Sequence, residues 1–181
     1  MQSSLVMTII GEDKPGLVES IANLVAEHGG NWLESRMSRL GGQFAGILRV
    51  EAPSDQKGLL VDSLRSLQSR GLTVVVHPDE RSAEVRGETL CSLEIVGHDR
   101  PGIVREISRA LARRGVNVEE LETERASAAM SGEMMFTARA RLNAPPDCDI
   151  SELRRELEKI SQDLIVEVSL HELPTETLGR R

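Results

Sequence analysis

Aromatic residues are nearly absent from this sequence: among 181 residues there are one tryptophan, two phenylalanines and no tyrosine. The hydrophobic core must therefore be built from aliphatic side chains. The scarcity also disfavours RNA-recognition domains, which stack bases on aromatic side chains of their strands. The net charge of −7 opposes non-specific attraction to nucleic acid or to anionic membranes. We therefore expect no direct nucleic-acid partner and no membrane partner.

Cysteines and long apolar runs are scarce as well. Cys91 and Cys148 lack metal-ligand spacing, so we expect two reduced thiols in a cytoplasmic protein. No apolar run is long enough to cross a bilayer, and the N-terminus has no basic region typical of a signal peptide. The four histidines fall in different predicted elements. We therefore expect no metal, no cofactor and no catalytic residue.

The sequence does contain an internal repeat. Residues 11–32 and 97–118 align without a gap at an offset of 86 residues. A repeat of this kind indicates two copies of one small folding unit. Nine positions are identical: Gly11/Gly97, Asp13/Asp99, Pro15/Pro101, Gly16/Gly102, Val18/Val104, Ile21/Ile107, Ala26/Ala112, Gly29/Gly115 and Asn31/Asn117.

Each copy begins with a predicted strand, helix and second strand. Leu5–Ile10 and Cys91–Val96 are β-rich runs that each end at a glycine. Apolar residues at helical spacing follow in both copies, and Asn31 and Asn117 then open the second strands.

The helix boundaries are predicted by proline and glycine. Pro15 and Pro101 fit the first helical turn, where no backbone N–H is needed. Gly29 and Gly115 fit the left-handed position that follows the last turn.

The repeat returns further along at an offset of 92 residues, where Phe44 matches Phe136. The second copy has therefore gained six residues, which we place in the hairpin near Ser127–Glu133. A third strand, a second helix and a fourth strand follow in each copy, with the fourth strands at Leu72–His77 and Leu164–Leu170.

The predicted fold class is α+β, with two tandem ferredoxin-like βαββαβ domains. In each domain two helices cover one face of a four-stranded antiparallel sheet. The expected boundaries are 1–78 for the first domain, 79–89 for a polar linker, 90–173 for the second domain and 174–181 for a mobile tail.

The candidate site is the turn from the first strand into the first helix. Its glycines permit close backbone approach, and a helix start presents unpaired N–H groups that suit a carboxylate. Asp13 or Asp99 could accept hydrogen bonds from an amino group, and we expect Asn31 and Asn117 at the same end of the sheet. The candidate ligand-binding residues are Gly11, Asp13, Lys14, Pro15, Gly16 and Asn31 in the first copy, and Gly97, His98, Asp99, Arg100, Pro101, Gly102 and Asn117 in the second.

A purely structural role is the alternative. Asp13 and Asp99 could cap the helix, while proline and glycine shape a turn and asparagine tolerates a tight corner. Spacing alone does not separate this alternative from ligand binding.

The turn motif resembles that of the tandem ACT-domain family, which includes the glycine cleavage operon repressors. Thr8, Gly11, Asp13, Pro15, Gly16 and Val18 match the family pattern, with Lys14 in place of arginine. Gly97, Asp99, Arg100, Pro101, Gly102 and Val104 match it in the second copy, where Glu94 replaces the expected threonine. The resemblance extends from about Leu5 to Leu173.

This resemblance implies a non-catalytic regulator that senses a small amino acid of the glycine or serine class. The ligand site would lie between ACT units, lined by the first turn of one and the second-strand start of another. The protein would act on transcription through a partner such as a transcription activator, or on an enzyme of amino-acid metabolism through protein contact. A homodimer is possible, and the open sheet face of the first copy is the expected contact because it is more apolar than that of the second.

An acylphosphatase-like enzyme is the competing hypothesis. Such enzymes share the predicted order of strands and helices and use an arginine and an asparagine. Arg100 and Asn117 would supply them in the second copy, but the first copy has Lys14 instead of the arginine.

Overall fold

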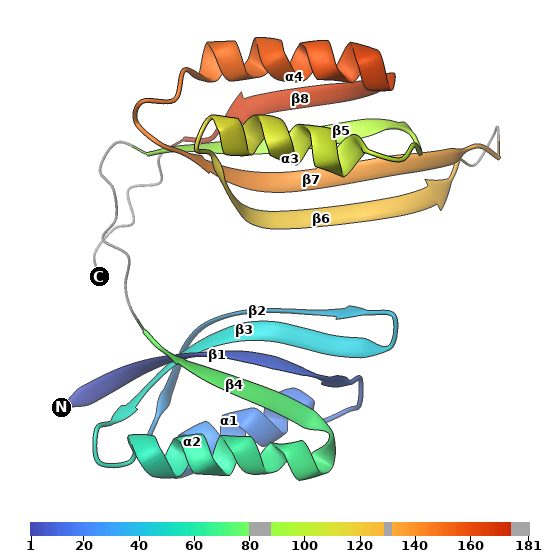
Figure 1. Cartoon of the computed structure of the whole chain (residues 1–181). Helices are drawn as coiled ribbons and strands as arrows, with labels where there is room; N and C mark the ends of the chain where they lie inside the picture. Colours follow the sequence, from blue (N-terminus) through green and yellow to red (C-terminus); the bar gives the residue numbers. More distant parts are fainter. Residues whose placement is uncertain (80–87, 129–131, 175–181) are drawn as a thin grey trace. The chain divides into compact units, whose positions relative to one another are not determined.

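The computed structural model describes residues 1–79, 88–128 and 132–174, which form two compact units divided between residues 82 and 83. Each unit has the predicted order strand-helix-strand-strand-helix-strand (Figure 1). Unit 1 contains β1 (Gln2–Glu12), α1 (Leu17–Glu27), β2 (Asn31–Leu40), β3 (Gln43–Pro53), α2 (Lys57–Ser66), a 3-10 turn (Leu67–Arg70) and β4 (Leu72–Pro78). Unit 2 contains β5 (Thr89–His98), α3 (Ile103–Arg113), β6 (Asn117–Ser127), β7 (Met134–Ala144), α4 (Ile150–Leu164) and β8 (Val166–Glu172).

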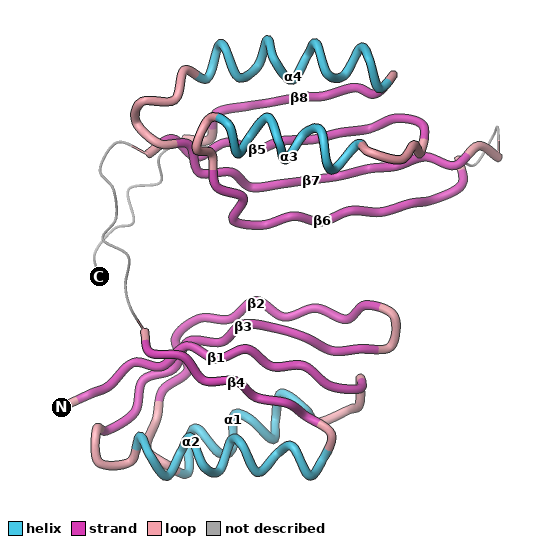
Figure 2. The backbone as a smooth tube through the Cα atoms, viewed as in Figure 1, coloured by secondary structure: helices cyan, strands magenta, loops and turns pink. Residues whose placement is uncertain are grey.

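Each unit is one four-stranded sheet with both helices on the same face (Figure 2). The strand order is β2-β3-β1-β4 in unit 1 and β6-β7-β5-β8 in unit 2, and every neighbouring pair is antiparallel. The predicted fold class is therefore confirmed for both copies.

The core of each unit is aliphatic, as the scarcity of aromatics requires. Along β1, buried and more exposed residues alternate, so Leu5, Met7 and Ile9 point toward the helices. Leu60 and Leu64 of α2 meet them with no exposed surface. Burying one such side chain stabilises the fold by about 1.5–3 kcal/mol, so the helices are held mainly by this face.

The helices begin later than their prolines suggest. α1 and α3 start one residue after Gly16 and Gly102, whose φ angles are 88° and 101°. The left-handed glycine separates each proline from the helix, so the prediction that Pro15 and Pro101 occupy the first turn was wrong. The predicted helix ends are confirmed, because Gly29 and Gly115 have φ angles of 65° and 68°.

The last strand of unit 2 starts later than predicted. α4 continues to Leu164, and Ile165 turns the chain with a φ of 55° before β8 begins at Val166. β5 begins at Thr89, one residue inside the expected linker. Most of that linker (80–87), part of the inserted hairpin (129–131) and all but one residue of the tail (175–181) lie outside the described residues.

Both second strands carry a bulge at the same place. Pairing moves from Trp32↔Val50 to Glu34↔Arg49, which leaves Leu33 as an extra residue in β2. In β6 the same shift leaves Glu119 as the extra residue. The duplication therefore extends to an irregularity that sequence periodicity does not reveal.

Candidate functional site

The repeated turn forms a corner at one end of each sheet: residues 11–16 make the first corner and residues 97–102 the second. The Asp13 N–H donates to the Gly42 carbonyl at 2.9 Å, and the Asp99 N–H donates to the Met134 carbonyl at 2.9 Å. Each corner is thus tied by its backbone to the neighbouring hairpin, and both corners are built in the same way.

The aspartates of the corners pair with arginines of the second strands. Asp13 Oδ2 lies 2.8 Å from Nε of Arg39, and Asp99 Oδ2 lies 2.6 Å from Nε of Arg125. The aspartate side chains are 32% and 29% exposed, so each pair remains accessible to solvent. Sequence reasoning missed both arginines, although they continue the repeat at the offset of 86 residues.

Neither aspartate caps its helix. The N-cap residues of α1 and α3 are Gly16 and Gly102, and neither helix start has a side-chain cap hydrogen bond. The capping alternative was therefore wrong. Because glycine has no side chain to offer, no side-chain cap satisfies the first-turn N–H groups at the positive end of the helix dipole.

Close packing explains why positions 11 and 97 are both glycine. A Cβ atom on Gly11 would lie 2.5 Å from the Gly71 carbonyl oxygen, and one on Gly97 would lie 2.7 Å from Cγ1 of Val166. These two glycines therefore allow close packing within the sheet. Ligand binding is therefore not needed to explain why these two glycines recur in both copies.

The charged flanks differ between the corners. Glu12 pairs with Lys14 at 2.8 Å, and the hydrogen bond from that ammonium lowers the pKa of the Glu12 carboxyl. At the second corner Nδ1 of His98 lies 3.8 Å from the Glu133 carboxylate, while Arg100 is exposed. The two corners therefore share the same backbone contacts and aspartate–arginine pair but differ in the charged side chains on either side of the aspartate.

Asn31 and Asn117 do not lie beside the corners. Asn31 pairs in register with Glu51, which faces Ser4 at the start of β1. Gly11 is seven residues further along β1, a separation of roughly 23 Å. The prediction that these asparagines share an end of the sheet with the corner was wrong, because the helix returns the chain to the end where β1 begins.

The same geometry argues against the acylphosphatase hypothesis. Asn117 pairs with Asn143 at one end of β7, whereas the second corner, which contains Arg100, meets the other end at Phe136. An arginine and an asparagine at opposite ends of one sheet do not act on one phosphate.

Other chemically reactive groups give no second candidate. Both cysteines are free, and burial raises the pKa of each thiol above its ordinary value. Within residues 1–79, 88–128 and 132–174, no cluster of His, Cys, Asp or Glu could hold a metal ion. None of the described helices is long and apolar enough to cross a membrane.

Comparison with known families gives one match in each unit. Residues 3–77 match a family model described as ACT domain, and residues 92–143 match a second model with the same description.

Two curated proteins are similar to nearly the whole chain. The glycine cleavage system transcriptional repressor of Escherichia coli is 22% identical over 94% of this chain and 90% of its own length. Phosphoserine phosphatase SerB2 of Mycobacterium tuberculosis is 22% identical over 93% of this chain, which spans only 41% of the phosphatase.

A solved structure described as an unknown protein from Galdieria sulphuraria has the same fold. It is 27% identical, covers 96% of this chain and 99% of its own, and superposes with a TM-score of 0.86.

Proposed function

Because the chain is a tandem ACT-domain protein, we propose that it is a non-catalytic cytoplasmic regulator that senses a small amino acid of the glycine or serine class. The observation that best supports this proposal is that both corners have the same two features. Each has an aspartate paired with an arginine, and each has a helix start without a side-chain cap. A zwitterionic amino acid has an ammonium group to pair with the aspartate and a carboxylate to bind the start of the helix.

The ligand carboxylate would bind the uncapped N–H groups at the start of α1 or α3, where the helix dipole favours an anion. The ammonium group would bind Asp13 or Asp99. Each aspartate uses Oδ2 for its arginine, and a carboxylate has several further acceptor positions. The arginine therefore orients the aspartate without using all of its acceptor capacity.

The site would need a second unit to be complete. Asn31 and Asn117 lie at the far end of their own sheets, so they can approach a corner only when that corner belongs to a different unit. A ligand enclosed in this way binds the paired arrangement better than the separated one. Only such a difference in affinity can turn binding into regulation.

Isothermal titration calorimetry of the full chain with glycine, serine and leucine tests the sensing function. Glycine or serine should give saturable heat, while leucine should give little. A folded sample that binds none of the three would contradict the proposal.

The regulated process would be transcription of the glycine cleavage operon, through a DNA-binding transcription activator. The similarity to the Escherichia coli repressor along 90% of that protein supports this choice. Deleting the gene should raise the operon transcript in cells grown without glycine. An unchanged transcript, with amino-acid binding intact, would favour the second candidate function.

That second candidate is control of an enzyme of amino-acid metabolism by protein contact. It is favoured by the phosphatase match, in which a similar pair of units makes up part of an enzyme chain. Purified phosphoserine phosphatase from the same cells would then change its activity when this protein and serine are added together.

A further inference from the structure

The sheet of unit 1 has an exposed apolar surface on the face that its helices do not cover. Ile10, Ile47 and Val75 are 51%, 54% and 48% exposed on three different strands. Ile47 faces Thr8, which faces Val75, so they lie in one row across the sheet. We call this surface the apolar face; its apolar residues are Val6, Ile10, Ala45, Ile47 and Val75, and it also holds Thr8, whose hydroxyl lies 3.4 Å from Nε2 of His77.

The equivalent surface of unit 2 is polar, although the fold is the same. Arg139 replaces Ile47, and it pairs with Glu94 at 3.2 Å. Ser169 replaces Val75, and Ser92 replaces Val6. The fold therefore does not require apolar residues at these positions, so the apolar face of unit 1 calls for a separate cause.

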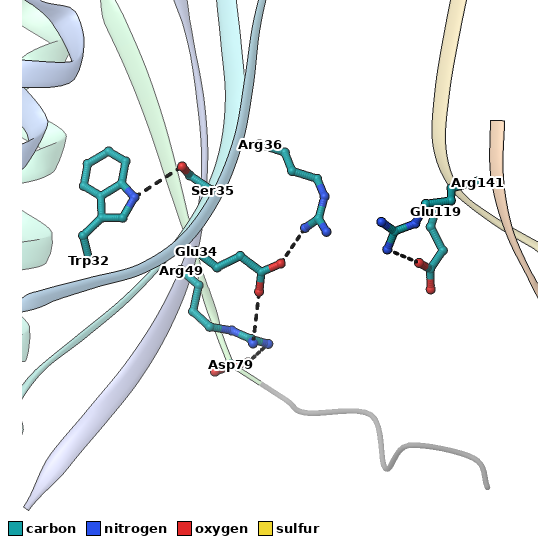
Figure 3. A network of polar contacts seen from close by, with 8 residues as sticks. All are labelled: Trp32, Glu34, Ser35, Arg36, Arg49, Asp79, Glu119 and Arg141. Carbon is teal, nitrogen blue, oxygen red and sulfur yellow. Dashed lines mark hydrogen bonds and ion pairs between the residues drawn. The ribbon is translucent and has the colours of Figure 1, made fainter. Parts of the chain in front are cut away.

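We propose that the apolar face binds the same face of a second copy of this chain, giving a two-fold symmetric dimer. The charges at its rim are already paired within unit 1: Glu34 with Arg36 at 2.7 Å, and Arg49 with Asp79 at 3.2 Å (Figure 3). A second apolar face can therefore cover the patch without burying an uncompensated charge.

The open face of unit 2 is a poorer occupant. Its Arg139 and Glu94 side chains, 66% and 50% exposed, take the central positions of Ile47 and Thr8 rather than the rim, so isoleucine and valine would cover the ion pair itself and remove it from water. That desolvation costs several kcal/mol per ion. A self-complementary contact avoids this cost, and two-fold dimers are the commonest form of homo-oligomer.

The size of the face sets the strength of the dimer. Three strands about 4.8 Å apart, with about three outward residues on each, give a patch of roughly 15 Å by 20 Å, or about 300 Å² per partner. Stable interfaces bury about 800 Å² per partner, so the dimer should be weak and reversible. This inference is independent of amino-acid binding.

Analytical ultracentrifugation of the full chain between about 1 and 300 µM tests the dimer. The wild-type mass should rise with concentration from 19.9 kDa toward twice that value. Val75→Lys should raise the dissociation constant at least tenfold, because each substitution acts twice across the two-fold axis. Ser169→Lys makes the matched change on unit 2 and should leave the association unchanged.

Ile47→Ala provides a second variant that adds no charge, and it should also weaken the dimer, with an unchanged circular dichroism spectrum. A single-chain mass for wild type at every concentration would overturn the proposal. So would equal association of wild type and Val75→Lys. Loss of association in Ser169→Lys as well would assign the contact to both sheets and likewise overturn it.

Discussion

The carboxylate of Asp13 lies 2.8 Å from the guanidinium of Arg39, joining the first corner to the last part of β2. Asp99 and Arg125 make the same pair in unit 2 at 2.6 Å. These pairs are partly exposed, and exposed ion pairs contribute about 0–1 kcal/mol to stability. Orienting the aspartate side chain therefore explains the presence of this pair in both units better than stabilisation of the fold does.

Replacing the aspartates separates these two roles. The double variant Asp13→Asn/Asp99→Asn should lose at least tenfold in affinity for glycine or serine, because the amide no longer attracts an ammonium group. Its free energy of unfolding in urea should fall by less than about 1 kcal/mol for each site. As the matched control, Arg39→Gln/Arg125→Gln should keep measurable binding. A large loss of stability with intact binding would show that the pairs are structural.

Replacing Ile165 tests the strain of a non-glycine residue in the left-handed region. Ile165 has a φ of 55°, whereas the equivalent residue before β4 is Gly71 with a φ of 82°. Left-handed conformations cost a branched residue about 1–2 kcal/mol, so Ile165→Gly should raise the free energy of unfolding by about 1 kcal/mol. The reverse change, Gly71→Ile, should lower it. A destabilising Ile165→Gly would mean that the exposed Ile165 side chain makes contacts that outweigh its backbone strain.

The groove between the first helix and the second strand is filled differently in the two units. Trp32 packs against the core of unit 1, while its counterpart Val118 lines a pocket of about 40 Å³ with Leu121, Val104 and their neighbours. Trp32→Val should lower the free energy of unfolding by about 2 kcal/mol, because it leaves a cavity. Val118→Trp should raise it by about 1 kcal/mol by filling the pocket. Urea titrations of the three proteins give both values, and a destabilised Val118→Trp would show that the pocket does not admit the ring.

Acidification should weaken the contact between α3 and α4. The hydrogen bond from Arg113 is the main cause that holds the pKa of the Glu156 carboxyl below its usual value of 4.5. The stabilisation is therefore complete above about pH 4.5 and is lost as the pH falls through the lower folded-state pKa. Glu156→Gln should thus be less stable than wild type at pH 7, and this deficit should shrink as the pH falls below about 4.5.

Glu158→Gln, on the same helix, is the control for that comparison. The Glu158 side chain has no ion-pair partner among the described residues, so this variant should differ from wild type at pH 7 by less than Glu156→Gln does. A Glu156→Gln variant whose deficit is equally large at both pH values would contradict the assigned ion pair.

Much of the fold could be predicted because the repeat reports the same pattern twice. The left-handed Gly29 and Gly115, the strand starts at Asn31 and Asn117, and the match of Phe44 with Phe136 all follow from local chemistry. Each depends on a turn type or a periodicity that neighbouring residues determine. The conformation of Ile165 could not be predicted, since no local rule places isoleucine at a positive φ.

The candidate site was predicted less well because it depends on which ends of elements meet. The prediction that Asn31 lies beside Asp13 fails because a strand, a helix and a parallel strand bring the chain back to its starting end. That topological rule was available from the predicted order of elements alone. Arg39 was available too, but an arginine on a strand indicates a partner only when the face on which it lies is known.

Leu33 and Glu119 decide which side of the sheet the far half of each second strand presents. Trp32 points toward the helices, and strict alternation over seven residues would send Arg39 to the opposite side. The extra residue shifts the phase by one, so Arg39 arrives on the helix side within reach of Asp13. Deleting Leu33 would turn the Arg39 side chain outward. The Asp13 carboxylate would then lose its arginine partner, although it lies about 20 Å from the deletion.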